Sequence, residues 1–291
     1  MKLVTFSRSE ITHIGVLCSE NGDQVIHDLN ILDPSLPADL STFLTQGEPA
    51  LEKARRAQLM MNKAAIFPLQ EVNLRAPIPR PGKILCVGLN YRDHIIESGL
   101  AVPEYPVIFA KYSNCIIGPN DPIVLPRVTR QVDWEGELGV VIGKRARFVS
   151  KQEALDYVAG YVVFNDVSAR DYQFFTSQWT IGKAFDTFGP MGPALVTTDE
   201  IPDPAGLEIR TWVNDQVMQH SNTRHLVFDV PSLISYLSEV MTLDPGDLMI
   251  TGTPAGVGFT RSPQLFLQPG DLVRVEIEKI GYIENPVISQ A

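Results

Sequence analysis

The first part of the chain alternates short apolar runs with turn residues. Three such runs, at residues 3–6, 14–17 and 24–27, are separated by polar positions that include Asn21-Gly22-Asp23. Short apolar runs bounded by turn signals are typical of β-strands, so we predict a strand at each. Residues 49–62 are rich in Ala, Leu, Lys and Arg. These are strong helix formers, and we predict a helix there.

A proline-rich stretch then interrupts the pattern. Residues 76–82 contain Pro77, Pro79 and Pro81. Proline lacks a backbone N–H, so this stretch can continue neither a helix nor a central strand. We therefore predict a small N-terminal domain over residues 1–75, a linker over 76–82 and a larger domain over 83–291. With 291 residues, of which 44% are hydrophobic, the chain can bury a core in each part.

The larger domain reads mainly as strands. Apolar runs at 83–87, 140–142 and 161–164 predict strands, and residues 273–277 alternate apolar and charged positions. A capping box, Ser150-Lys151-Gln152-Glu153, predicts a short helix that stops at Gly160, and Pro231 predicts the start of another that reaches Thr242. Helices this few cannot alternate with every strand. The prediction is an α+β, mostly β fold rather than a doubly wound parallel sheet.

Three acidic residues sit at the ends of predicted strands. Glu135 and Glu137 precede one apolar run, and Asp166 follows another. On an extended chain residues i and i+2 share a face about 6.6 Å apart, so Glu135 and Glu137 can converge on one cation. Three carboxylates without His or Cys favour a hard cation, Mg²⁺ or Mn²⁺, and Ca²⁺ also suits such a set. The alternative is a solvated strand rim, because the spacing of two glutamates is common.

Positive and polar residues follow this acidic group. With a divalent ion, Arg170 and Lys183 would suit a substrate that carries two carboxylates, or one carboxylate and a forming enolate. Thr253 lies in the glycine-rich stretch 251–258, which could bind a carboxylate through its hydroxyl and backbone N–H groups. For Arg170 and Lys183 the alternative is a surface charge or an ion-pair partner. For Gln173 it is a solvated amide, and for the stretch 251–258 it is a tight turn between strands.

His94 and Glu97 are candidates for acid–base chemistry. They are three residues apart in a segment that follows a predicted strand, so on a short helix they would share a face. A carboxylate beside an imidazole fixes its tautomer, which suits proton transfer or activation of water. The alternative is an exposed histidine–glutamate pair without function.

Several long motifs occur in an order that resembles the fumarylacetoacetate hydrolase family. The resemblance covers residues 80–291. The matching stretches are Val87-Gly88-Leu89-Asn90-Tyr91-Arg92-Asp93-His94, Asp133-Trp134-Glu135-Gly136-Glu137-Leu138, Asn165-Asp166-Val167-Ser168-Ala169-Arg170-Asp171, Lys183-Ala184-Phe185-Asp186-Thr187-Phe188 and Thr251-Gly252-Thr253-Pro254. The short N-terminal segment resembles that of the domain-containing protein 2 branch. One departure is Gly136, where close relatives often have a bulkier residue.

The resemblance implies a fold, a metal site and a set of roles. It implies a mixed β-roll catalytic domain, a small N-terminal α/β domain and a homodimer. It also implies that Glu135, Glu137 and Asp166 ligate Mg²⁺ or Mn²⁺. Lys183, with His94 and Glu97, matches catalytic positions. Arg170, Gln173 and Thr253 match substrate-binding positions.

The resemblance further implies chemistry on small 2-oxo acids through a metal-bound enolate. Within it we expect first an oxaloacetate keto–enol tautomerase, and as alternatives an acylpyruvate hydrolase or an oxaloacetate decarboxylase. Another alternative is a catalytically silent protein that binds 2-oxo acids. The net charge of −10 argues against binding to nucleic acid or to an anionic membrane. Three scattered cysteines and no visible signal peptide favour the cytoplasm or the mitochondrial matrix.

Overall fold

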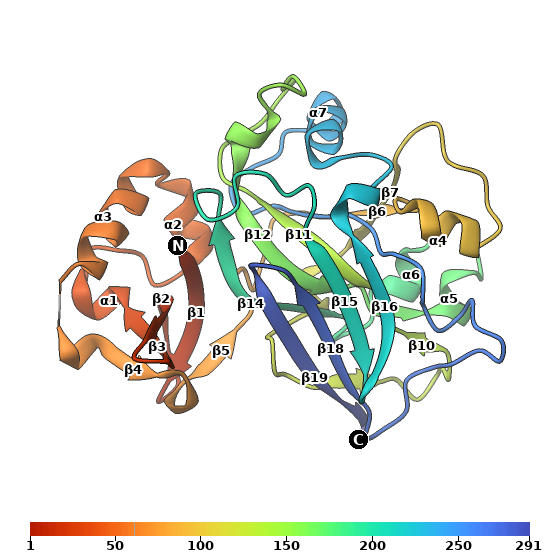
Figure 1. The fold of residues 1–291 in the computed structure, drawn as a ribbon, viewed down its shortest axis with the longest axis horizontal. Helices are drawn as coiled ribbons and strands as arrows, with labels where there is room; N and C mark the ends of the chain where they lie inside the picture. The colour runs from red at the N-terminus through yellow and green to blue at the C-terminus, as the bar shows by residue number, and fades with distance from the viewer. Residues whose placement is uncertain (61) are drawn as a thin grey trace.

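A computed structural model describes residues 1–60 and 62–291. Strands dominate the fold, as the sequence predicted, and most of them belong to one long sheet (Figure 1). Ten strands of that sheet follow one another in the order β4 (Ile66–Pro68), β3 (Asp23–Asp28), β2 (Ile11–Glu20), β1 (Lys2–Arg8), β14 (Gly189–Thr197), β12 (Val158–Asn165), β11 (Gly136–Ile142), β17 (Leu248–Ile250), β6 (Ile84–Gly88) and β7 (Val107–Lys111). β5 (Asn73–Arg75) also pairs with β1, and β8 (Ile116–Ile117) with β14.

A second sheet packs against the middle of the first. Its order is β16 (Gln216–Asn222), β15 (Glu208–Val213), β18 (Leu272–Ile277), β19 (Gly281–Ser289) and β9 (Ile123–Leu125). Alternate residues of β18, namely Val273, Val275 and Ile277, are buried, which confirms the alternation seen in the sequence. A two-stranded ladder of β10 (Val132–Asp133) and β13 (Ser168–Ala169) lies beside the ends of β11 and β12.

The N-terminal elements match their prediction closely. The three predicted strands lie within β1, β2 and β3. They are followed by α1 (Leu29–Leu32), α2 (Leu40–Thr45) and α3 (Glu48–Gln58). The helix predicted over 49–62 is α3, which ends earlier, at Gln58; of the remaining residues, Met61 lies outside the described residues. Asn62 instead accepts a hydrogen bond from Ala64 N and caps a short 3₁₀ helix, Lys63–Ala65.

This N-terminal region is joined to the rest of the molecule by backbone pairing. Lys2 and Leu3 of β1 pair with Val196 and Leu195 of β14, so one sheet runs through both parts. A single apolar cluster includes Leu3 from the first part and Phe164 from the second. The division into domains at residues 76–82 stays a prediction, and the two parts share a sheet and a core.

The helix predicted from the capping box is wrong. Ser150 Oγ does lie 2.5 Å from Glu153 Oε2, but only a 3₁₀ turn, Ala154–Tyr157, follows. The chain then enters β12, which includes Gly160. A Cβ at Gly160 would lie 2.1 Å from Val196 O, so this glycine allows close approach of β14 rather than ending a helix.

The remaining helices are short apart from one. The helix predicted from Pro231 is α7 (Val230–Val240), which Asp229 caps by accepting a hydrogen bond from Ser232 N. α4 (Arg92–Glu97), α5 (Arg170–Gln173) and α6 (Thr180–Lys183) lie together on the right of Figure 1 and carry several of the candidate site residues. Within residues 1–60 and 62–291, no helix is both long and apolar enough to span a membrane.

Candidate active site

The three acidic residues singled out from the sequence converge. Glu135 directly precedes β11, Glu137 lies on β11, and Asp166 directly follows β12. β11 and β12 are antiparallel, with Gly136 opposite Asn165, so the start of one strand meets the end of the other. One carboxylate oxygen from each residue lies within 4.8 Å of the other two. The expectation from the spacing of Glu135 and Glu137 therefore agrees with the geometry.

These carboxylates are not a solvated strand rim. The exposed fractions of Glu135, Glu137 and Asp166 are 6%, 2% and 0%. Buried carboxylates are costly unless they are paired or bound to a metal. Each of the three must therefore be compensated by cations from the chain or from outside it.

Two buried lysines supply part of that compensation. Lys183 at the end of α6 places its Nζ 2.7 Å from Glu135 Oε2 and 2.9 Å from Asp166 Oδ2, and it is 1% exposed. Lys183 is thus not a surface charge, and it is an ion-pair partner of both carboxylates, which was the other alternative. Lys111 places its Nζ 2.8 Å from Asp166 Oδ1. Lys111 was not singled out from the sequence; its signal was a lone lysine at the end of the apolar run 107–110.

The carboxyl groups differ in their proton affinity. Burial alone raises the pKa of Glu135, but Lys183 and Arg170 outweigh burial and lower this pKa to about 2. Burial raises the pKa of Glu137 well above its usual range, and the nearby Asp166 and Glu135 raise it further. Glu137 also accepts a hydrogen bond from Gly252 N. The charge of Glu137 is thus the one that the chain leaves least compensated.

This donor set fits a divalent cation. It consists of three buried carboxylates with oxygen atoms close enough to share one ion, and sulfur and imidazole ligands are absent from the described cluster. Oxygen-only sets of this kind are typical of hard cations. An added double positive charge would also offset the unfavourable ionisation of Glu137. The three residues form a candidate divalent-metal site.

Arg170 lies beside the acidic group but is held by protein groups. It begins α5, and its Nη1 lies 2.5 Å from Glu135 Oε1 and donates to Gln173 Oε1 at 3.0 Å. Its Nε and Nη2 each lie 2.8 Å from Asp133 Oδ2. Arg170 and Gln173 are both 4% exposed, so neither is a surface side chain. Asp133 was quoted in a motif, but its role was not recognised from the sequence.

His94 and Glu97 form the expected pair on α4. His94 Nδ1 lies 3.2 Å from Glu97 Oε2, and Glu97 Oε1 accepts a hydrogen bond from Gly256 N at 2.9 Å. Burial alone raises the pKa of Glu97, but His94 and the Gly256 N–H outweigh it, and the pKa is lowered. The two side chains are 12% and 23% exposed, which excludes a freely solvated pair.

Thr253 is oriented by the second sheet. Its Oγ1 donates to Gly136 O at 3.0 Å and accepts from Gln219 Nε2 at 2.7 Å. Gln219, on β16, is 1% exposed and also accepts from Gly136 N at 2.9 Å. A Cβ at Gly136 would lie 2.3 Å from Thr211 Oγ1, so the missing side chain allows the second sheet to approach the site. This close approach accounts for glycine at position 136.

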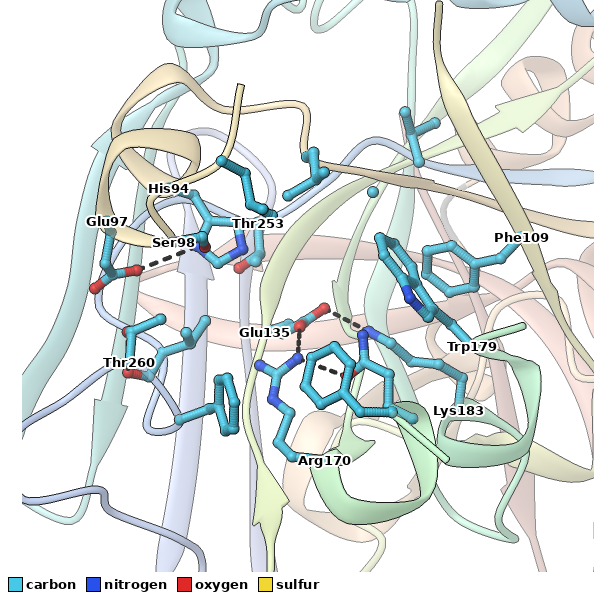
Figure 2. A pocket seen from close by; sticks show the side chains of 18 of the residues that line it. His94, Glu97, Ser98, Phe109, Glu135, Arg170, Trp179, Lys183, Thr253 and Thr260 are labelled. Atoms are coloured by element: carbon cyan, nitrogen blue, oxygen red, sulfur yellow. Dashed lines mark hydrogen bonds and ion pairs between the residues drawn. The ribbon is translucent and has the colours of Figure 1, made fainter. Parts of the chain in front are cut away.

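One cavity of about 340 Å³ brings these groups together. Figure 2 shows Glu135 between Lys183 and Arg170, with His94 and Glu97 on another side and Phe109 and Trp179 beside Lys183. The side chains of the predicted site that line it are His94, Glu97, Glu135, Glu137, Arg170, Gln173, Lys183 and Thr253. Asp166 does not line the cavity, but it pairs with Lys183, which does. Apolar wall residues include Leu89, Leu100, Phe109, Phe174, Trp179 and Phe259.

The family model described as fumarylacetoacetate (FAA) hydrolase C-terminal matches residues 83–288 of this chain. The chain belongs to the fumarylacetoacetate hydrolase family. The matched range contains all five motifs that suggested the resemblance. It also contains every residue of the candidate site.

Named relatives of this family match nearly the whole chain. The chain is 47% identical to oxaloacetate tautomerase fahd2, mitochondrial, from Xenopus laevis, over 99% of this chain and 90% of that protein. It is 46% identical to oxaloacetate tautomerase FAHD2A, mitochondrial, from Homo sapiens, over 99% and 92%. Fumarylacetoacetate hydrolase domain-containing protein 2 from Pongo abelii is also 46% identical, over 99% and 92%. The predicted similarity to that branch is confirmed.

Solved structures of the family have the same fold. A fumarylacetoacetate hydrolase from Exiguobacterium antarcticum has a TM-score of 0.85 and 36% identity, with 100% of both chains covered. A maleylpyruvate hydrolase from Sphingobium sp. SYK-6, in complex with manganese(II) and pyruvate, has a TM-score of 0.82 and 35% identity, again with 100% coverage of both. The predicted mostly β fold of this family is therefore confirmed.

Proposed function

We propose that this protein is a divalent-metal-dependent oxaloacetate keto–enol tautomerase. The observation that carries the proposal is one cavity lined by Glu135, Glu137, Lys183 and the His94–Glu97 pair, with Asp166 close enough to both glutamates to share one cation with them. Keto–enol exchange needs a positive environment for an enolate and a group that moves a proton, and this cavity offers both. The names of the relatives that match nearly the whole chain support oxaloacetate as the substrate.

Glu135, Glu137 and Asp166 would hold the cation, for which we propose Mg²⁺ or Mn²⁺. When bound, a divalent cation supplies Lewis-acid polarisation of substrate oxygens. The manganese in the related maleylpyruvate hydrolase supports a divalent ion of this size and hardness. Ca²⁺ also suits an oxygen-only set.

Lys183 stabilises negative charge that develops on the substrate. Its ammonium group lines the cavity and is buried, and the carboxylates of Glu135 and Asp166 raise its pKa although burial alone lowers it. Lys183 therefore stays protonated at neutral pH. A fixed positive charge favours an enolate, whose oxygen is negative, over the keto form, whose carbonyl oxygen is uncharged. Arg170 adds positive charge, and Gln173 and Thr253 offer polar groups to the substrate.

His94 takes the proton from C3 of the substrate, and a proton is delivered to the oxygen at C2; in the reverse direction His94 returns a proton to C3 as the enol oxygen loses its own. His94 Nδ1–H donates a hydrogen bond to Glu97. The other ring nitrogen, Nε2, is then the one that can accept a proton. Gly256 N in turn fixes Glu97. His94→Ala should slow exchange by roughly 10²–10⁴-fold, the scale of a lost general base. His27→Ala is a matched control. His27 Nε2 lies 2.7 Å from Glu20 Oε1, and this pair is outside the cavity, so its loss should leave the rate unchanged.

The reaction is tested by mixing the protein with enol-oxaloacetate and Mg²⁺. The loss of enol absorbance and the formation of pyruvate are followed in parallel. Fast enol loss with little pyruvate supports the tautomerase. Pyruvate formed as fast as enol is lost identifies a decarboxylase. Absence of turnover with tight binding of oxaloacetate identifies a silent binding protein.

A second candidate function is hydrolysis of an acylpyruvate. The observation that favours it is the similarity to maleylpyruvate hydrolase, together with the apolar wall of Phe109 and Trp179, which would accept an acyl group. For hydrolysis His94 and Glu97 would activate water instead of moving a substrate proton. Rapid cleavage of acetylpyruvate without action on oxaloacetate would identify this activity.

Two further proposals follow from the family resemblance. We propose a homodimer, which light scattering after size-exclusion chromatography tests. We also propose a location in the mitochondrial matrix or the cytoplasm. The mitochondrial designation in the names of the animal relatives supports the first of these compartments.

A further inference from the structure

Asp133 stands out among the buried groups that the proposed chemistry does not use. It lies on β10, two residues before Glu135, and is 0% exposed. Its Oδ2 accepts from Arg170 Nε at 2.8 Å and from Phe259 N at 2.9 Å. Its Oδ1 accepts from Trp134 N at 2.8 Å and Gly258 N at 2.7 Å. Oδ2 is therefore engaged by two residues of the cavity wall, Arg170 and Phe259, and Oδ1 by the backbone of Trp134 and Gly258, each of which directly precedes a wall residue.

Arg170 contacts Asp133 on one side and Glu135 on the other. Its Nε and Nη2 contact Asp133, and its Nη1 contacts both Glu135 and Gln173. Nη2 is buried from solvent, and its contact with Asp133 Oδ2 is an ion pair without hydrogen-bond geometry. A guanidinium has five N–H groups in a fixed plane, so anchoring Nε and Nη2 also fixes the direction of Nη1. Asp133 thereby sets the position of the donor that holds Glu135 Oε1.

We propose that Asp133 is a positioning residue that, through Arg170, holds the Glu135 carboxylate in the orientation required to bind the divalent cation. This inference rests on the proposed metal site but on no particular substrate. The sequence predicted that Arg170 binds the substrate directly. In this proposal the main role of Arg170 is instead to orient Glu135.

A second set of contacts ties Asp133 to the proton-transfer pair. Asp133 fixes Gly258 N and Phe259 N, and two residues earlier Gly256 N donates to Glu97 Oε1. The loop at residues 256–259 therefore binds Asp133 at one end and Glu97 at the other. Asp133 thus contacts both Arg170, beside the metal site, and the loop that binds Glu97, beside His94.

The test measures Mn²⁺ affinity of the full-length protein without any substrate, by calorimetry and by the electron paramagnetic resonance signal of free Mn²⁺. Asp133→Asn should weaken Mn²⁺ binding by about 10–100-fold, the usual effect of losing a group that orients a metal ligand. Asp247→Asn is the matched control. Asp247 is also a buried aspartate that accepts from a backbone N–H and pairs with a cation, Lys83, but it lies outside the cavity. Its replacement should leave Mn²⁺ affinity unchanged.

A charge-neutral double variant separates orientation from charge and guards against misfolding. Asp133→Asn with Arg170→Gln removes one negative and one positive charge, so it leaves the net charge near the ion unchanged and leaves no buried guanidinium unpaired. This variant should also bind Mn²⁺ about 10–100-fold more weakly. Affinity equal to the wild type in the folded double variant would overturn the proposal. If the wild-type protein itself binds no Mn²⁺, both the proposed metal site and the positioning role of Asp133 are wrong. If the wild type and both Asp133 variants bind equally, only the inference fails.

Discussion

At the residue scale, the site depends on charges that are buried before any ligand arrives. Sequence spacing grouped Glu135, Glu137 and Asp166 correctly, because residues at adjoining strand ends must lie near one another. Spacing could not show that Lys111 and Asp133 belong to the same cluster. Their contacts cross between distant segments: Lys111 Nζ reaches Asp166 from β7, and Asp133 reaches the loop at Gly258.

Lys183 is the cation whose loss should affect turnover most. Lys183→Ala removes a buried ammonium group beside the substrate oxygens, and kcat should fall by roughly 10²–10³-fold. Steady-state kinetics with enol-oxaloacetate measures this. Lys83→Ala is the control, since Lys83 is likewise paired with two carboxylates, Asp244 and Asp247, but lies outside the cavity. Near-normal kcat in Lys183→Ala would contradict the role proposed for it.

Glu137 should make metal binding depend on pH. Its pKa is raised in the metal-free protein, chiefly by burial, and a ligand carboxylate must be deprotonated. Binding therefore releases a proton, and Mn²⁺ affinity should rise with pH, by at most about tenfold per unit, until the raised pKa is passed. Titrations at several pH values measure this. Glu137→Gln should bind weakly and lose the dependence. Affinity in the wild type that is flat between about pH 5 and 8 would count against the assignment.

At the scale of elements, hydrophobic periodicity located strands better than helices. The predicted N-terminal strands and α7 were found, because strong periodic or capped segments fold as their local pattern indicates. The helix predicted to end at Gly160 was wrong, because the pairing of β12 with β14 requires a glycine there. A local signal was thus overridden by a contact with a strand distant in the sequence.

Gly136 offers a direct test of how tightly the two sheets pack at the site. In Gly136→Ala the new Cβ would lie 2.3 Å from Thr211 Oγ1 and 3.0 Å from Val275 Cγ1. Overpacking of this kind should lower the free energy of unfolding by about 1–3 kcal/mol. Denaturant titration measures the change. Adding Thr211→Ala should restore part of the loss, since Thr211 Oγ1 has no hydrogen-bond partner among the described residues. Unchanged stability in Gly136→Ala would show that the sheets can separate at little cost.

At the scale of the whole molecule, the N-terminal region and the remainder share one sheet. The sequence indicated where the proline-rich stretch lies but not that β1 would pair with β14 across it, because pairing partners leave no local trace. Removal of residues 1–75 would expose the edge of β14 and the apolar cluster around Phe164. The shortened chain should therefore lose cooperative unfolding or aggregate. Calorimetry that shows a cooperative transition in residues 76–291 would instead support an independent catalytic domain.

The central claim is that one divalent cation, held by Glu135, Glu137 and Asp166, is required for oxaloacetate tautomerisation. The most direct measurement is the rate of enol-oxaloacetate loss by protein treated with EDTA and freed of chelator, before and after Mg²⁺ or Mn²⁺ is added back. We expect the catalysed rate to disappear without metal and to return with it in the wild type, but not to return in Glu137→Gln at the same metal concentration. Full activity in a rigorously metal-free sample would contradict a role for the cation.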